Sequence, residues 1–449
     1  MAITARTSDA PVAWWREPTK DQWFAWFAGF FGWMLDAFDY TIFLFIMVPV
    51  ASEFGVSVTA VAAVLTLTIW LRLVGAIGSG WLADRVGRKV PLMLSILWFS
   101  VCNFIAGFSP NFTFLFVVRA ALGIGMGAEW PAGAGLAMES WPARSRGLMG
   151  SILQGAFPLG FALASAAYWL FFDAIGWRGL LWLGILPAIL CVFIRYFVKE
   201  PEVWVENRKR QREQNQEVRA PLLAIFKPAL LVNTLTACLW MAGALVVYNS
   251  IYALFATWLQ TDFKLAAAAV ATPLLLSNLA SFAGNCFWGG LADRIGRRGS
   301  IIIQAITGCI VAPAYLLTND LNWIIVGFII QGCFGGSLPA LAPSYLTERF
   351  PTEVRTTGSG FCYHVGMVFA GFVPPVISYL AIEQQMGFAM PMLIGTLAGS
   401  ASVIVALLFS PETKGKVFVP DLMSTSSKPD AAAIELCHTP VRQGGSVSP

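Results

Sequence analysis

The 449-residue chain is predicted to be an all-α membrane protein with twelve transmembrane helices in two homologous six-helix halves. Three observations predict this fold class: the composition, twelve apolar stretches, and a sequence element that occurs twice. Residues of the AVILMFWYC set make up 57% of the chain and charged residues only 12%, with a mean hydropathy of +0.68. Soluble domains average roughly 25% charged residues. The composition therefore excludes soluble enzymes, nucleic-acid binders and disordered scaffolds, and the small net charge of +4 indicates no acidic partner.

The apolar stretches are each long enough to cross a bilayer, for which about 20 residues suffice. In the first half they cover residues 22–50, 58–82, 90–109, 111–138, 146–172 and 177–199. In the second half they cover residues 228–259, 265–292, 300–318, 321–347, 355–382 and 387–410. These stretches predict an N-terminal bundle over 22–199 and a C-terminal bundle over 228–410.

Lysine and arginine predict the orientation in the membrane, because cytoplasmic loops carry an excess of both. With the N-terminus in the cytoplasm, the cytoplasmic segments contain 24 such residues and the outer loops contain two, Arg178 and Lys264. We therefore expect a multi-pass protein of the inner cell membrane whose N-terminus (1–21) and C-terminal tail (411–449) are both cytoplasmic. The tail, rich in Ser, Pro and Ala, is predicted to be disordered.

One long polar connection, residues 200–227, joins the two predicted bundles. We interpret it as a cytoplasmic linker that is partly helical and lies at the surface. Its basic run would also suit contact with anionic lipid headgroups, but a solvated linker is the favoured interpretation.

An internal repeat relates the two halves. Residues 80–89 (GWLADRVGRK) and 289–298 (GGLADRIGRR) match at seven of ten positions, at an offset of 209. The same offset aligns Gly123 with Gly332, Gly127 with Gly336, Glu139 with Glu348, Pro142 with Pro351 and Arg146 with Arg355. Several matches at one offset without gaps indicate two homologous six-helix halves.

These elements carry a family resemblance. GxLADRxGRK/R resembles the signature of the major facilitator superfamily, and Arg119 with Gly123, Gly125 and Gly127 resembles its RxxxGxGxG element. The stretches GWMLDAFDY (32–40) and EWPAGAGLAMESWPARSRG (129–147), with Trp15, Arg16, Gln22 and Trp23, are similar to the sialate:proton symporter family, which includes lactate-type permeases. The resemblance covers about residues 14–412. It implies the major facilitator fold and proton-coupled symport of an organic carboxylate by alternating access. Some sialic-acid permeases have an extra helix pair in the middle of the chain, which residues 200–227 are too short and polar to supply. This weakens sialate as the substrate and leaves smaller carboxylates as candidates.

Buried acids are the candidates for proton coupling. Asp36 and Asp39 lie near the middle of the first span and share one helix face. Two carboxylates this close disfavour double ionisation, so one of them should bind a proton readily. The offset of 209 aligns them with Leu245 and Tyr248, so the repeated scaffold does not require acids there. Glu129 is a third candidate carrier, with a gate or an arginine partner as the alternative.

Buried arginines are the candidates for substrate binding. Arg72 and Arg119 each offer a guanidinium that matches a carboxylate bidentately, and either could instead be the counter-ion of the acids. The resemblance favours Arg119. His364 joins them as the membrane-embedded histidine, since an unperturbed pKa of about 6.5 would also suit a proton relay; an ordinary buried histidine is the alternative.

The repeated loop element is predicted to be a conformational latch. An acid at a helix end that faces arginines and a helix N-terminus can form contacts that break when the halves rock. The resemblance associates this element with the outward-facing state. The latch residues are Gly80, Asp84, Arg85, Gly87, Arg88, Lys89, Asp293, Arg294, Arg297 and Arg298.

Metal and cofactor sites are not predicted. The eight cysteines are scattered, and none has a CxxC or Cys/His spacing. The sequence contains no recognisable pair of a nucleophile and a base, so an enzyme is not predicted. The expected partners are an organic anion, protons and the lipid bilayer, with no nucleic acid and a monomeric state. An aromatic-acid, sugar or drug transporter of the same superfamily is the alternative, and a non-transporting receptor is a more distant one.

Overall fold

Helices form nearly all of the computed structural model, which describes residues 13–420 and contains no β-strand in that range. The first bundle consists of α1 (Lys20–Phe54), α2 (Val58–Val86), α3 (Lys89–Ala106), α4 (Phe112–Ser140), η1 (Ala143–Ser145), α5 (Arg146–Gln154), α6 (Ala156–Trp182), η2 (Leu183–Ile185) and α7 (Ala188–Phe197). The connection contains α8 (Glu202–Glu213) and α9 (Pro221–Ala224). The second bundle consists of α10 (Pro228–Tyr252), α11 (Phe255–Thr261), α12 (Ala267–Ile295), α13 (Arg297–Leu316), α14 (Leu321–Gln331), η3 (Gly332–Gly336), α15 (Ala342–Arg349), α16 (Arg355–Ala370), α17 (Val373–Ser378), η4 (Tyr379–Glu383) and α18 (Ala389–Leu408).

Twelve membrane passes can be traced through these helices. Within residues 13–420, nine helical segments are long and apolar enough to cross a membrane, or ten with the bent α1 counted as one. The segment Ala143–Phe197 makes two passes, because the chain turns back at Gly176, whose φ of 63° lies in the left-handed region. The shorter apolar segment Leu321–Gly336 makes the remaining pass. The predicted fold class of twelve transmembrane helices is confirmed.

The first helix is bent where its sequence contains a proline. α1 begins after a capping box formed by Thr19 and Gln22, and its two parts meet at 49° between Phe45 and Met47. Pro49 explains the bend, because its ring clashes with the carbonyl four residues earlier, that of Phe45.

The span predicted over 321–347 was wrong in one respect, since it is not a continuous helix. α14 ends at Gln331, a π-helical turn follows, and residues 337–341 form turns before α15 begins. Glycines at 332, 335 and 336 explain the interruption, because glycine is a poor helix former. They also allow close packing: a Cβ at Gly332 would lie 2.5 Å from the carbonyl oxygen of Ser277. The span predicted over 355–382 is similarly divided into α16, α17 and η4.

Contacts between backbones fix α2 against α4. A Cβ at Gly75 would lie 1.8 Å from the carbonyl oxygen of Ile124, and one at Gly127 would lie 1.9 Å from that of Arg72. Only glycine permits this approach, as at other small-residue interfaces of membrane helices. The contact fixes the depth at which Arg72 enters the first bundle.

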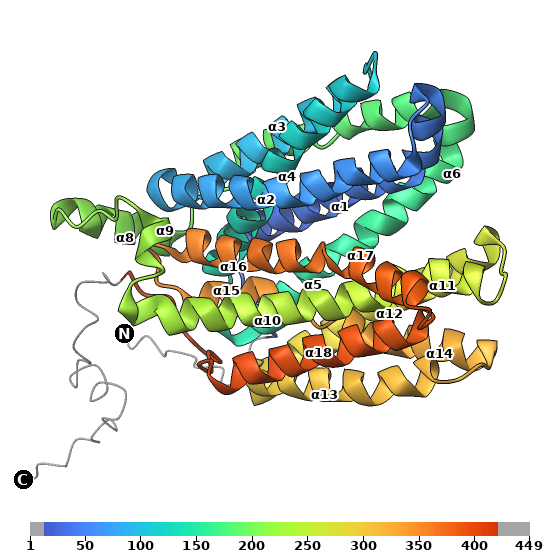
Figure 1. Ribbon diagram of the computed structural model, residues 1–449. Coiled ribbons are helices and arrows are strands. Elements are labelled where there is room, and N and C mark those ends of the chain that lie inside the picture. Colours follow the sequence, from blue (N-terminus) through green and yellow to red (C-terminus); the bar gives the residue numbers. More distant parts are fainter. Residues whose placement is uncertain (1–12, 421–449) are drawn as a thin grey trace, which may run out of the picture.

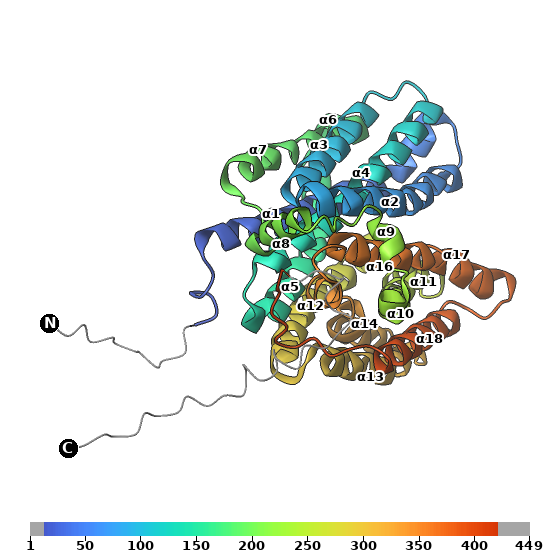
Figure 2. The same ribbon diagram turned by 90° about the vertical axis from the view of Figure 1, so that its left-hand side faces the viewer.

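The two bundles lie side by side, with α1 to α7 (blue to green) in one and α10 to α18 (yellow-green to red) in the other (Figure 2). The end that carries α8, α9 and both ends of the described chain is here called the linker end (Figure 1). The ribbons of the two bundles lie closest at the linker end and diverge toward the far end (Figure 1). α2 faces α16 there, and a Cβ at Gly80 would lie 2.6 Å from the Cα of Thr357.

Candidate functional site

Two of the predicted residues form a buried ion pair inside the first bundle. Arg72 on α2 donates from Nη1 and Nη2 to the two carboxylate oxygens of Asp36 on α1, at 2.8 and 3.2 Å. Asp36 is fully buried and Arg72 is 1% exposed. Such a bidentate pair satisfies two charges that would each be costly alone in a bilayer.

The second pair of predicted residues is joined through an amide. Asn103 on α3 donates to Asp39 at 3.0 Å and accepts from Arg119 Nη1 at 3.0 Å. The ring of Phe43 lies 4.0 Å from the guanidinium carbon of Arg119. Arg119 Nε and Nη2 are buried and have no hydrogen-bond partner among residues 13–420. These two N–H groups form one side of a guanidinium fork, so Arg119 can still bind a carboxylate bidentately.

Glu129 on α4 lies beside these pairs without a partner of its own. Its two carboxylate oxygens are buried and make no hydrogen bond within the part of the chain that the structure describes. Oε1 faces α1, because a Cβ at Gly32 would lie 2.4 Å from it. An ionised carboxylate is costly in such surroundings, so Glu129 is more stable as the neutral acid.

An aromatic contact joins the two bundles near these charges. Trp130 on α4 stacks on Tyr363 of α16, with ring centroids 4.0 Å apart and planes inclined by 17°. Gln154 on α5 accepts from Trp130 Nε1 at 3.2 Å and donates to the Tyr363 hydroxyl at 3.1 Å. Gln154 and Tyr363 are related by the repeat offset of 209, so the contact lies on the axis between the halves.

His364 lies next to this aromatic contact. Its Nδ1 lies 2.9 Å from the carbonyl oxygen of Gly360, whereas Nε2 is buried and unpartnered among the described residues. Trp33 of α1 approaches the neighbouring Tyr363 edge-on, and its Nε1 is also unpartnered there. Both nitrogens are thus available to a bound polar group.

The predicted latch joins the two bundles at the linker end. Asp84, at the end of α2, accepts hydrogen bonds from the backbone N–H groups of Thr356 and Thr357 at 3.1 and 3.0 Å, and from the Thr357 hydroxyl at 2.7 Å. These groups begin α16 in the other bundle. A carboxylate at a helix N-terminus is stabilised by the free N–H groups and the helix dipole.

The second half of the predicted latch repeats this arrangement in the reverse direction. Asp293, at the end of α12, accepts from the backbone N–H groups of Gly147 and Leu148 at the start of α5, both at 2.9 Å. The offset of 209 relates every member of this half of the latch to one of the first. Each half of the protein thus caps a helix of the other.

Arginines and glutamates support both halves of the latch. Arg88 donates to Glu139 and Arg297 donates to Glu348, each with two nitrogens. Ion pairs between bundles follow the same symmetry: Arg146 with Glu348 at 3.4 Å, and Arg355 with Glu139 at 3.2 Å. The repeat alignment paired Glu139 with Glu348 and Arg146 with Arg355. No role was predicted for these four residues from the sequence, whereas Arg88 and Arg297 were predicted to belong to the latch.

The remaining predicted latch residues lie around this network. Gly87 and Gly296 have φ of 118° and 105°, and a Cβ at either would meet a carboxylate, that of Glu200 or Glu412. Those carboxylates accept from the backbone N–H groups of Arg88, Lys89, Arg297 and Arg298. Arg85 lies over the Trp81 ring, and Arg294 accepts a hydrogen bond from Lys414 through its carbonyl. Burial raises the pKa of Glu200, although the hydrogen bonds from α3 oppose this shift.

The described part of the predicted tail, residues 411–420, packs against the linker end. Arg146 donates to the carbonyl oxygen of Lys416 at 2.7 Å, and Thr413 donates to Glu348 at 2.6 Å. The ring of Phe418 lies between two guanidinium groups, 3.9 Å from Arg146 and 3.9 Å from Arg355. The rest of the predicted tail, like residues 1–12, lies outside the described residues.

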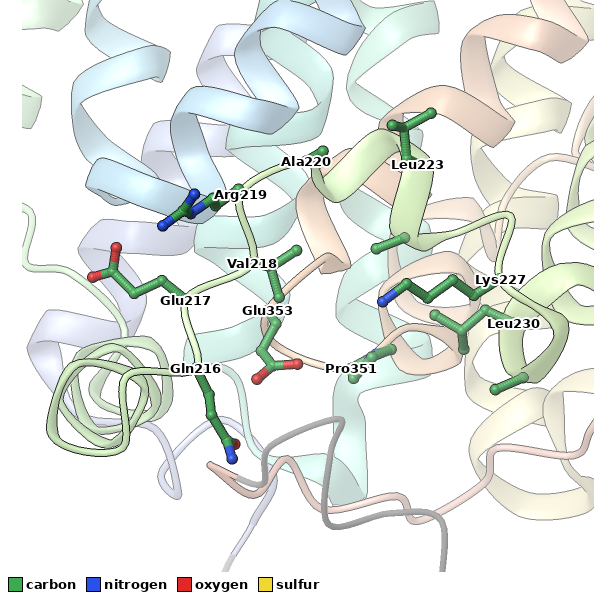
Figure 3. Close-up of a pocket in the computed structure, with 12 residues that line it drawn as sticks. Gln216, Glu217, Val218, Arg219, Ala220, Leu223, Lys227, Leu230, Pro351 and Glu353 are labelled. Carbon is green, nitrogen blue, oxygen red and sulfur yellow. The ribbon is translucent and has the colours of Figure 1, made fainter.

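One cavity, about 780 Å³, lies at the linker end and shares no residue with the buried charges. It is lined by residues 216–220, 223, 224, 227, 229, 230, 351 and 353. Lys227 extends across it, whereas Glu217 and Arg219 extend away from it (Figure 3). The lining of this cavity therefore contains none of the predicted proton-coupling or substrate-binding residues. Among residues 13–420 there is also no group of three His, Cys, Asp or Glu side chains that could hold a metal ion.

Comparisons with known proteins agree with this architecture. The family model described as Major Facilitator Superfamily matches residues 29–277 and 239–425. The chain is 31% identical to a probable 4-methylmuconolactone transporter of Cupriavidus pinatubonensis, over 90% of this chain and 94% of that protein. It is 26% identical to the sialic acid transporter NanX of Escherichia coli, over 91% and 98%. The solved structure of the proton:xylose symporter XylE superposes with a TM-score of 0.71 at 16% identity, over 90% of this chain and 99% of that one. The chain is thus an integral membrane protein and not an enzyme, and it belongs to the major facilitator superfamily.

Proposed function

We propose that this protein is a proton-coupled symporter of an organic carboxylate that works by alternating access. The observation that carries the proposal is the buried charge set Asp36, Arg72, Asp39 and Arg119, in which Arg119 keeps two N–H groups unpaired. Charged groups inside a membrane are rare and mark substrate and proton pathways. The free side of the guanidinium is the place for the substrate carboxylate.

The charge balance of this set supports coupling to protons. Two ionised acids and two arginines sum to zero when Glu129 is neutral. A bound monocarboxylate would leave one uncompensated negative charge in the bilayer, which is costly. A proton on Asp39 removes that charge, so carboxylate and proton are expected to cross together, one proton for each carboxylate group.

The relatives support an organic acid as the substrate. Three similar proteins are named as transporters of 4-methylmuconolactone, sialic acid and cis,cis-muconate. The last of these proteins is 27% identical over 79% of this chain. The stacked Trp130 and Tyr363 beside the charges favour the unsaturated acids among these candidates, because flat conjugated groups pack well on aromatic rings.

We place the linker end in the cytoplasm of the cell and both termini with it, since the lysines and arginines of the loops gather there. With both halves of the latch formed, the described structure is closed on this side. It is the form that would admit substrate from outside, and breaking the latch would open the path to the cytoplasm.

Uptake into proteoliposomes tests the proposal. Labelled lactate, cis,cis-muconate, nicotinate and sialate are offered with and without an inward proton gradient, with the membrane voltage held at zero. We expect one of these acids to accumulate with the gradient and a protonophore to abolish the accumulation. If the uptake of every one of these acids were independent of the proton gradient, proton coupling would be overturned.

If Asp84 is part of a latch, replacing it should impair the conformational change of the protein and preserve substrate binding. In Asp84→Asn the amide keeps one oxygen acceptor and loses the charge that α16 binds. Hydrogen bonds to a charged group contribute about 1.5–3 kcal/mol, so the closed form should become at least about tenfold less populated. Transport should slow while substrate affinity stays within a few-fold, measured by equilibrium binding on the purified variant. Asp293→Asn, its repeat counterpart, should behave alike, and a large loss of affinity in both would contradict the latch.

A further inference from the structure

Asn103 is a fully buried amide that separates two charges of the proposed transport site. Its Nδ2 lies 3.0 Å from Asp39 Oδ1, and its Oδ1 lies 3.0 Å from Arg119 Nη1. No ion pair joins Asp39 directly to Arg119 within residues 13–420. Within the described part of the chain, the amide therefore lies in the only hydrogen-bonded connection between these two side chains.

The orientation of this amide follows from the chemistry of its neighbours. A guanidinium can only donate, so the oxygen of Asn103 must face Arg119 and its NH₂ group must face Asp39. Asp39 Oδ1 then has to accept. This favours Oδ2 as the oxygen that carries a proton, because the unprotonated oxygen of a carboxylic acid is the stronger acceptor. Asp39 Oδ2 is buried and has no hydrogen-bond partner among the residues described.

The surrounding helices fit this arrangement closely. Gly184 in η2 lies against the amide, and a Cβ there would be 2.0 Å from Asn103 Nδ2 and 2.7 Å from its Cγ. The Phe43 ring covers one face of the Arg119 guanidinium. The amide thus has little room to turn or to withdraw from between the two charges.

We propose that Asn103 is a positioning residue for coupled transport, which keeps Asp39 and Arg119 one amide apart and directs the transported proton to Asp39 Oδ2. The inference rests on the proposed proton-coupled transport of a carboxylate. A direct ion pair at short range would be strong in this environment and would hold Asp39 ionised. It would also occupy the donors with which Arg119 binds substrate. The intervening amide leaves the acid free to take up and release a proton.

Other ionisable groups face the same region and are unchanged in the test below. They are Arg72 from α2, Cys102 from α3, Arg119 and Glu129 from α4, Asp36 and Tyr40 from α1 itself, and Tyr248 from α10. α6 meets this part of α1 at Gly160, next to Met34 and Ala37.

Substrate counterflow measured over a range of equal internal and external pH tests the inference with Asn103→Asp. A carboxylate at this position still accepts from Arg119, cannot donate to Asp39 when ionised, and adds a negative charge beside it. Both changes favour the protonated acid. The midpoint of the pH profile should move toward alkaline pH by at least about one unit.

Gly184→Ala provides a second variant, because its Cβ displaces the amide without altering any charge. The donor to Asp39 is weakened, so we expect a smaller shift in the same direction. Ser100→Ala, about one turn away on α3, is the matched control and should keep the wild-type profile. If counterflow became slower in both Asn103→Asp and Gly184→Ala but the midpoint of the pH profile did not move, the positioning role would be overturned. Failure of the proposed function would look different, since the wild-type protein itself would then ignore the proton gradient.

Discussion

Replacing Asp39 by asparagine is expected to abolish proton-driven accumulation while substrate exchange continues. The neutral amide resembles the protonated acid and cannot release a proton. The charge set then binds a carboxylate without a proton, because the added negative charge neutralises the excess positive charge of the variant. With the membrane voltage held at zero, accumulation ratios in proteoliposomes should fall to about one at any pH gradient, since nothing couples the two fluxes. Counterflow of labelled against unlabelled substrate should persist.

The exposed acid Asp173 on α6 supplies the control for this experiment. Asp173→Asn removes the same charge from the same bundle at an exposed position outside the charge set, and should accumulate substrate like the wild type. Accumulation that survives in Asp39→Asn would place the coupled proton elsewhere. Asp36 of the charge set and the neighbouring Glu129, both buried, would then be the candidates.

Replacing Arg119 by lysine is expected to weaken substrate binding by roughly tenfold or more. An ammonium cannot offer the planar fork of Nε and Nη2, and a charged hydrogen bond contributes about 1.5–3 kcal/mol. Lysine would also lose the fixed hydrogen bond to Asn103. Equilibrium binding on the purified variant measures the effect, and the concentration dependence of counterflow should shift by the same factor.

Arg178→Lys is the matched control for Arg119→Lys. Arg178 pairs with Glu53 at the far end of the first bundle, partly exposed, so its replacement should leave affinity unchanged. If Arg119→Lys bound substrate normally but lost its pH dependence, the arginine would belong to the proton relay. The substrate anchor would then pass to Arg72.

The fold could be predicted from the sequence because it depends on two features that the sequence shows directly, the apolar stretches and the internal repeat. Apolar length set the number of passes, and the offset of 209 related the halves. What it did not predict are local breaks that depend on particular residues. Pro49 bends α1, and the glycines at 332, 335 and 336 interrupt the tenth pass. Both signals were present in the sequence, but apolar length alone does not register them.

The charged residues of the candidate site were identified from the sequence, but the neutral ones were missed. Asp36 and Arg72 stood out because charges in apolar spans are costly. Asn103 was not singled out, because its side chain is neutral. The repeat offset aligns it with Ala312, so the repeated scaffold does not require a polar residue there, just as it does not require Asp36. Applying the repeat comparison to every polar residue, and not only to charged ones, would have found it. The Trp130–Tyr363 contact joins different halves, and no periodicity relates such partners.

Phe418 has a practical consequence for anyone who labels or shortens this protein. Its ring fills the space between Arg146 of one bundle and Arg355 of the other, so the chain is part of the assembled interface as far as this residue. A fluorescent protein or affinity tag joined before residue 418 would remove that ring and leave two guanidinium groups facing each other. Fusion junctions and stop codons therefore belong after Pro420, where the described contacts of the chain end.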